Sequence, residues 1–217
     1  MTSHPDSSTE PVEPTRVVVL YYSRTGATER LARAIATGAE RAHEPTAPID
    51  VWVRRVPALN ASQTPASEST GAPPITLDEL AAADGLIVGS PTRFGNMAAP
   101  LKHFIDQTGA LWASGALAGR PFGVFTSTGT LHGGQESTLL SMALPWLHHG
   151  MLMTGLPYTE PRLSHTHEGG TPYGASQVSE DGRADPTRLS RDEQTLAEHF
   201  GERIAKIAQR LKQTSEH

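Results

Sequence analysis

The 217-residue chain contains no cysteine. This absence excludes a disulfide scaffold, a thiolate metal site and a cysteine nucleophile, and it is compatible with a reducing cytosol, so we expect a cytoplasmic protein. Long apolar runs are also missing. No stretch approaches the roughly 20 residues that cross a bilayer, and the N-terminus shows no signal-peptide pattern, so we expect no membrane insertion. A formal net charge of −5 and the lack of a basic stripe argue against a nucleic-acid partner.

The composition is that of a globular protein, with 37% hydrophobic and 19% charged residues. Residues 1–15 are rich in Ser, Thr, Pro and Glu and predict a disordered lead-in. Residues 16–213 then predict a single domain that carries two long irregular segments, 57–74 and 157–188.

Strand and helix patterns alternate along this domain. Apolar runs predict strands over 16–22, 50–56, 85–89, 121–127 and 151–155. Helical periodicity predicts helices over 27–41, 76–83, from 98 or 99 onward, over 135–149 and from 190 onward, with capping boxes at Thr76–Glu79 and Ser190–Glu193. A β-α unit repeated five times predicts an α/β fold with a parallel five-stranded sheet and helices on both faces.

A short loop, Ser23–Thr28, joins the first strand to the first helix. The helix start offers unpaired N–H groups, hydroxyl side chains add donors, and Gly26 allows close backbone approach to an anion. The loop lacks the P-loop lysine and the dinucleotide Gly-x-Gly-x-x-Gly spacing. It suits a terminal phosphate monoester such as that of FMN, although an ordinary capped β-to-α turn is the alternative.

Two further loops follow the third and fourth predicted strands, over Ser90–Asn96 and Thr126–Gly134. Because the carboxyl ends of parallel strands meet at one edge of a sheet, we expect all three loops to lie together where such folds bind ligands. Glycines and hydroxyls there could serve the polar edge of a flat ring, and Phe94 could serve its face. Each loop alone could be a plain connector, but three of this kind at one edge favour a binding site.

Several strings of residues resemble the WrbA family of NAD(P)H:quinone oxidoreductases. They include Ser90–Asn96, Asp106–Gly109, Leu111–Leu117, Gly133–Glu136, His148–Met151 and Gly169–Ala175, within a match over residues 16–213. The resemblance implies a flavodoxin-like sheet of strand order 2-1-3-4-5. It also implies a homotetramer with shared active sites, bound FMN, and two-electron transfer from NADH or NADPH to quinones.

The same resemblance implies the site residues. For the FMN phosphate it implies Ser23, Arg24, Thr25, Gly26, Ala27 and Thr28, and for the ring it implies Pro91, Thr92, Arg93, Phe94, Gly95 and Asn96. For the pyrimidine and ribityl side of FMN it implies Ser127, Thr128, Gly129, Thr130 and Gly133. It also implies that His148 of a neighbouring subunit lies beside the ring. Trp112 is implied to wall the substrate pocket. Thr25 stands where many members carry an aromatic residue, and Leu131-His132 also departs from the family pattern, which affects the expected nicotinamide geometry.

The charges of the loops point to two-electron chemistry independently. The loops that flank the expected flavin carry Arg93 and His132 and no Asp or Glu before Glu136, so the surroundings favour a negatively charged reduced ring. No catalytic acid is required, although His148 could assist, and no metal site is expected because His165 and His167 have no evident third ligand. The alternatives are a one-electron flavodoxin-type carrier and a non-enzymatic factor that binds a protein partner.

Overall fold

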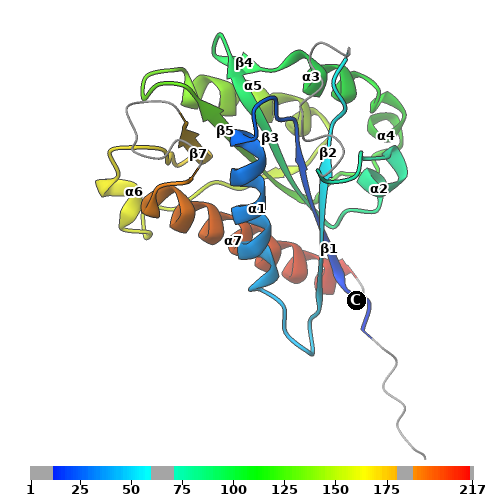
Figure 1. Ribbon diagram of the computed structural model, residues 1–217. Coiled ribbons are helices and arrows are strands. Elements are labelled where there is room, and N and C mark those ends of the chain that lie inside the picture. The colour runs from blue at the N-terminus through cyan, green and yellow to red at the C-terminus, as the bar shows by residue number, and fades with distance from the viewer. Residues whose placement is uncertain (1–11, 60–70, 180–187, 216–217) are drawn as a thin grey trace, which may run out of the picture.

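The computed structural model describes residues 12–59, 71–179 and 188–215. Its central sheet is parallel and contains β1 (Thr15–Tyr21), β2 (Ile49–Arg55), β3 (Gly85–Arg93), β5 (Pro121–Thr128) and β6 (Leu152–Met153). Their spatial order is β2-β1-β3-β5-β6, which confirms the predicted order 2-1-3-4-5 when these five strands are numbered along the chain (Figure 1). The carboxyl ends of β1, β3 and β5 therefore lie side by side.

Two strands were not predicted, and one of them changes an edge of the central sheet. Strand β7 (Gly174–Val178) pairs in parallel with the second half of β5, whereas β6 pairs with Pro121 and Phe122 at its beginning. The fifth position of the sheet is thus shared by two short strands, separated by an insertion that carries α6 (Arg162–His165). The prediction of an irregular segment over 157–188 is wrong for β7, and the predicted strand 151–155 is reduced to two residues. The side chains of β7 are mostly small or polar, so the sequence contains no apolar run that would predict this strand.

Strand β3 also extends further than its apolar run. It continues to Arg93 and turns back into β4 (Asn96–Met97), with Thr92 opposite Met97 and Arg93 opposite Asn96. The chain here forms a hairpin, not an open loop.

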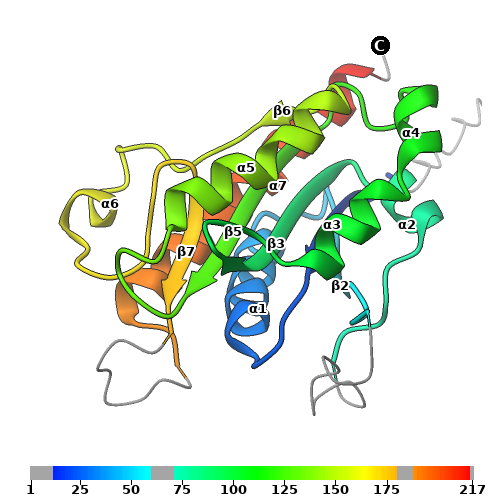
Figure 2. The same cartoon turned by 90° about the horizontal axis from the view of Figure 1, so that it is seen from above.

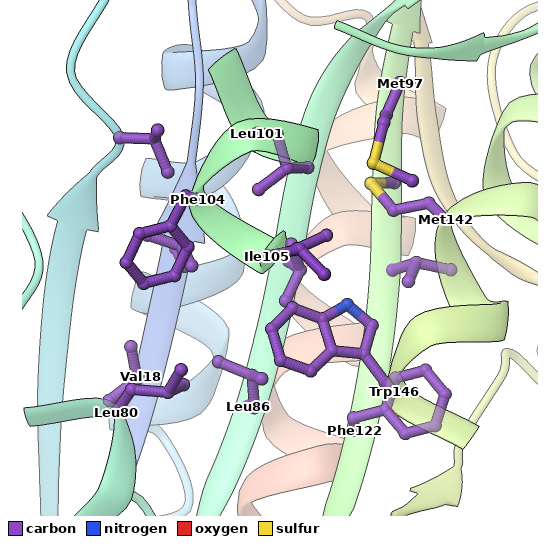
Figure 3. Packing of buried hydrophobic residues seen from close by; sticks show 14 of the residues in the cluster. Val18, Leu80, Leu86, Met97, Leu101, Phe104, Ile105, Phe122, Met142 and Trp146 are labelled. Atoms are coloured by element: carbon purple, nitrogen blue, oxygen red, sulfur yellow. The ribbon is translucent and has the colours of Figure 1, made fainter. Parts of the chain in front are cut away.

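Two layers of helices cover the sheet (Figure 2). Helices α1 (Ala27–Glu40) and α7 (Arg191–Ser215) pack on one face, against Val17 and Val19 of β1. Helices α3 (Ala99–Asp106) and α5 (Gln135–His148) pack on the other, against Val18 and Leu20. Alternate residues of β1 therefore serve opposite cores, as a strand buried on both faces requires. Figure 3 shows the second core, where Leu101 and Ile105 of α3 meet Met142 and Trp146 of α5.

Local signals set most helix boundaries. Both predicted capping boxes are present, at the starts of α2 (Leu77–Ala81) and α7. Pro100 lies in the first turn of α3, as predicted. Helix α2 ends two residues earlier than expected, and a separate helix, α4 (Gly109–Ser114), follows α3.

The N-terminal strand begins at Thr15, whose N–H donates to the Pro48 carbonyl at 2.8 Å, so the strand starts one residue earlier than predicted. Most of the predicted lead-in, and the parts of the two long segments over 60–70 and 180–187, lie outside the described residues. Within the described ranges, no helix combines the length and apolarity needed to span a membrane.

Candidate functional site

The three loops predicted to meet at the sheet edge do meet there. They enclose a cavity of about 400 Å³, which we call the small cavity. It is lined by Arg24, Thr25, Ala27 and Thr28 after β1, by Pro91, Thr92 and Arg93 of β3, by Ser127, Thr128 and Gly129 of β5, and by Ser179 after β7. Ser179 was not a candidate from the sequence, because its position depends on the unpredicted strand β7.

Helix α1 begins at this cavity without a side-chain cap. Its N-cap residue is Gly26, in the left-handed conformation (φ 89°), which has no side chain to bond the first-turn amides. Helices α2 and α7, by contrast, carry complete capping boxes. An uncapped helix start leaves N–H donors and a partial positive charge facing the cavity, which suits an anion.

Ser23 is predicted to hold the phosphate, and in the structure its side chain makes a hydrogen bond within the loop. Its side chain is buried, it does not line the cavity, and its Oγ accepts a hydrogen bond from the Gly26 N–H at 3.1 Å. Ser23 therefore shapes the loop and holds Gly26 in place.

Buried hydroxyls form the base of the small cavity. Thr28 Oγ1 and Ser127 Oγ lie 2.8 Å apart, which ties the first turn of α1 to the end of β5. Thr128 Oγ1 donates to the Thr130 carbonyl at 2.8 Å, and the Gly133 N–H donates to the same oxygen at 3.1 Å. The loop after β5 is thus closed on itself, and Thr130 and Gly133 support the site without lining the cavity.

The tip of the β3–β4 hairpin carries Phe94 with a positive φ of 53°, the only non-glycine residue with positive φ in the described chain. Gly95 follows with φ 76°, so both central residues are left-handed, as in a type I′ turn. The Phe94 side chain is fully exposed. A bulky residue in this conformation stores strain, and a fully exposed aromatic ring makes no compensating contact within the chain.

A second, larger cavity of about 970 Å³ adjoins the first, between α3 and α5. We call it the α3–α5 cavity. Arg24 and Arg93 line both cavities and so stand between them. Two of the predicted site residues, Asn96 and His148, line the α3–α5 cavity and not the small one.

Trp112 lines neither cavity. The residue is 58% exposed, and its indole Nε1 donates a hydrogen bond of 2.9 Å to the backbone carbonyl of His148. Helix α4 is thereby joined to the last turn of α5, beside the α3–α5 cavity.

The neighbouring His149 is buried, and desolvation lowers its pKa below the usual value. Thr108 Oγ1 donates to the Ile105 carbonyl at 2.7 Å and so accepts from His149 Nε2, 2.8 Å away. This arrangement fixes His149 as the neutral Nε2–H tautomer. His149 therefore acts in packing, whereas His148 lines the α3–α5 cavity.

The small cavity fits the phosphate end of FMN. Its lining combines an uncapped helix start, several hydroxyls and the guanidinium groups of Arg24 and Arg93. None of the described residues that line it carries a carboxylate. Such a donor set suits a dianionic phosphate and a ring that becomes negative on reduction.

Comparisons with known proteins agree with this chemistry. The model of the family described as "NADPH-dependent FMN reductase" matches residues 15–158. A protein of Paracoccus denitrificans named "NAD(P)H dehydrogenase (quinone)" is 44% identical over 203 residues, which cover 91% of this chain and 95% of that protein. "NAD(P)H dehydrogenase (quinone) 3" of Rhizobium meliloti is 43% identical over 202 residues, covering 89% and 92%.

A solved structure supports the fold alone. The "flavodoxin, WrbA-like protein from Agrobacterium tumefaciens" superposes with a TM-score of 0.62 at 24% identity and covers 90% of this chain and 98% of that one. The α/β architecture with its parallel sheet is therefore the flavodoxin-like one.

Proposed function

This chain belongs to the NADPH-dependent FMN reductase family, and we propose that it uses bound FMN to reduce quinones to hydroquinones with NAD(P)H. The relatives named above carry this activity in their names and match nearly the whole chain. The observation in the structure that carries the proposal is the small cavity, whose lining is cationic and hydroxyl-rich and contains no carboxylate among the described residues.

Bound FMN would supply two-electron chemistry, taking a hydride from the nicotinamide donor and passing it to a quinone. The chain contributes position and charge. The first turn of α1, with Thr25 and Thr28, would hold the phosphate, while Ser127 at the end of β5 contacts Thr28 and fixes its position. Arg93, at the rim between the two cavities, stabilises negative charge that develops on the ring.

The remaining site residues complete the proposal. Pro91, Thr92, Thr128 and Gly129 wall the ring and ribityl chain, and the exposed Phe94 is positioned at the rim to cover an aromatic face. His148 lines the α3–α5 cavity, where it can deliver a proton to a reduced quinone. Each of these roles is an assignment that FMN-binding measurements on single variants can test.

We also propose that the active form is a homotetramer with shared sites. Leu140, Leu144 and Leu147 form an exposed apolar stripe along α5, at spacings of four and three residues. Trp112 is exposed beside the end of that helix. A stripe of this kind next to a ligand cavity favours burial against another copy of the chain. Sedimentation of the wild type and of Leu144→Glu tests this: dissociation of an assembly by the charge supports it, and a monomeric wild type overturns it.

The test of the function is steady-state turnover of FMN-reconstituted protein with NADH or NADPH and benzoquinone. The proposal expects one hydroquinone formed per nicotinamide oxidised. A one-electron carrier would need a separate reductase, and an accessory protein would show no oxidation. Absence of quinone-dependent NAD(P)H oxidation in protein that retains FMN would therefore contradict the proposal.

A further inference from the structure

The α3–α5 cavity is richer in cationic groups than the flavin site requires. Arg24 and Arg93 stand at its border with the small cavity, and Lys102 and His103 of α3 line its wall. One guanidinium N–H of Arg93 donates a hydrogen bond to the Thr92 carbonyl at 2.7 Å, and the guanidinium has further N–H donors that can bind a ligand. Within the described chain, neither Arg24 nor Arg93 forms an ion pair with a carboxylate.

One carboxylate opposes these cations. Asp106 is the only acidic group among the described residues that line the cavity, and it lies 2.5 Å from Lys102 Nζ, one helical turn away. Both side chains are more than half exposed. Exposed pairs of this kind contribute little to stability, so Lys102 can turn to a ligand anion at small cost.

The wall also offers apolar surface from both helices and the hairpin, alongside the polar side chains of Asn96 and Ser141. Met97, Pro100, Leu144 and Pro145 provide this surface, beside Tyr22. A cavity that combines cationic side chains with apolar surface and adjoins the flavin site suits a ligand that joins a flat reactive ring to phosphate groups and a nucleoside. A small quinone carries no phosphate and needs only the space over the ring.

We infer that the α3–α5 cavity binds the phosphate-bearing part of the nicotinamide donor and that Lys102 and Asp106 set its affinity with opposite signs. This inference rests on the proposed function, because it names the donor's binding surface in the same reaction. The cavity's net positive charge favours the more highly charged donor, NADPH, over NADH. The positions of Lys102 and His103 are set by α3 alone, so they can be changed without altering the loops that form the small cavity.

Binding of NADP⁺ to FMN-loaded protein, measured by titration calorimetry, tests the inference without turnover. Lys102→Gln is expected to raise the NADP⁺ dissociation constant about tenfold, the usual effect of losing a charged hydrogen bond. Asp106→Asn is expected to lower it about two- to threefold, because the opposing charge is removed. NAD⁺ is expected to respond less than NADP⁺ to both substitutions.

The matched control is Lys206→Gln. Lys206 forms a pair with Glu202, also at 2.5 Å and one turn apart, but on α7 and away from both cavities. This variant is expected to bind NADP⁺ as the wild type does. FMN content is expected to be the same in all four proteins, which excludes an indirect effect through the cofactor.

Steady-state kinetics test whether the anionic group that binds in the α3–α5 cavity belongs to the nicotinamide donor or to the quinone acceptor. We expect the KM for NADPH to follow the dissociation constants, and the KM for uncharged benzoquinone and for a sulfonated naphthoquinone to stay unchanged. Unchanged NADP⁺ binding in Lys102→Gln and Asp106→Asn would overturn the inference, and so would a shift confined to the sulfonated acceptor. If the wild type binds NADP⁺ as described but reduces no quinone, the proposed function fails while this inference stands.

Discussion

The indole Nε1 of Trp112 lies 2.9 Å from the backbone carbonyl oxygen of His148 and donates a hydrogen bond to it. That carbonyl belongs to the last turn of α5, where carbonyl groups have no partner within the helix. The bond therefore closes the end of α5 and fixes the backbone that carries the His148 ring toward the α3–α5 cavity.

Trp112→Phe keeps an aromatic ring and removes this donor. We expect the free energy of unfolding to fall by about 0.5–1 kcal/mol, at the low end for a hydrogen bond because the indole is exposed. Urea unfolding measures the change. FMN content is expected to be unaltered, since Trp112 lines neither cavity, and a loss of FMN in Trp112→Phe would show that α4 also shapes the small cavity.

Phe94→Asn replaces a bulky residue at positive φ by one that tolerates the left-handed conformation. We expect the unfolding free energy to rise by about 1 kcal/mol, because the backbone strain is relieved. The FMN dissociation constant, measured by flavin fluorescence, is expected to rise as the aromatic cover is lost. Stabilisation without weaker FMN binding would refute the role assigned to the ring.

Glu193 is buried at the start of α7 and accepts hydrogen bonds from three backbone N–H groups, of Gly169 (3.2 Å), Val178 (2.8 Å) and Ser190 (2.9 Å). Glu193→Gln presents an amide N–H₂ to one of these donors. We expect a loss of about 1–3 kcal/mol in unfolding free energy, against little change for the control Glu202→Gln, whose partly exposed side chain pairs with Lys206. Weaker FMN binding is also expected, because Val178 precedes Ser179 at the small cavity.

His149 makes stability depend on pH. Its pKa is lowered in the folded protein by burial, whereas the unfolded chain keeps the ordinary value of about 6.5. Below that value the unfolded state binds a proton that the folded state does not, so stability is fully present above about pH 6.5 and falls as the pH drops toward the folded pKa. The slope is at most about 1.4 kcal/mol per pH unit.

His149→Phe should reduce this slope, and the exposed His132→Gln should leave it unchanged. Denaturant midpoints between pH 7 and pH 5 provide the comparison. An identical slope in wild type and His149→Phe would assign the pH dependence to other groups.

Local sequence signals predicted much of the fold. The capping boxes at Thr76 and Ser190, and Pro100 in a first turn, located three helix starts because each feature acts within four residues. Buried parallel strands gave apolar runs because both faces are covered. Strand β7 gave no such signal, since its pairing with β5 is supplied by backbone hydrogen bonds and its residues include Gly174 and Ser176.

The candidate site was predictable at the level of loops and not of individual contacts. The sequence placed Thr28 and Ser127 at one sheet edge, but their direct contact depends on the angle between α1 and β5. The α3–α5 cavity could not be predicted from the sequence for the same reason. Lys102 and Leu144 share no local pattern and are brought together only by the packing of two helices on one face of the sheet.

The central claim is that the small cavity holds FMN and that the bound cofactor accepts electron pairs from the nicotinamide donor. Anaerobic titration of the FMN-loaded protein with NADPH tests it most directly. The account predicts that the visible absorption of oxidised FMN is lost with one NADPH consumed per FMN and returns when benzoquinone is added. Protein that releases its FMN on desalting, or whose bound FMN stays oxidised in excess NADPH, would contradict it.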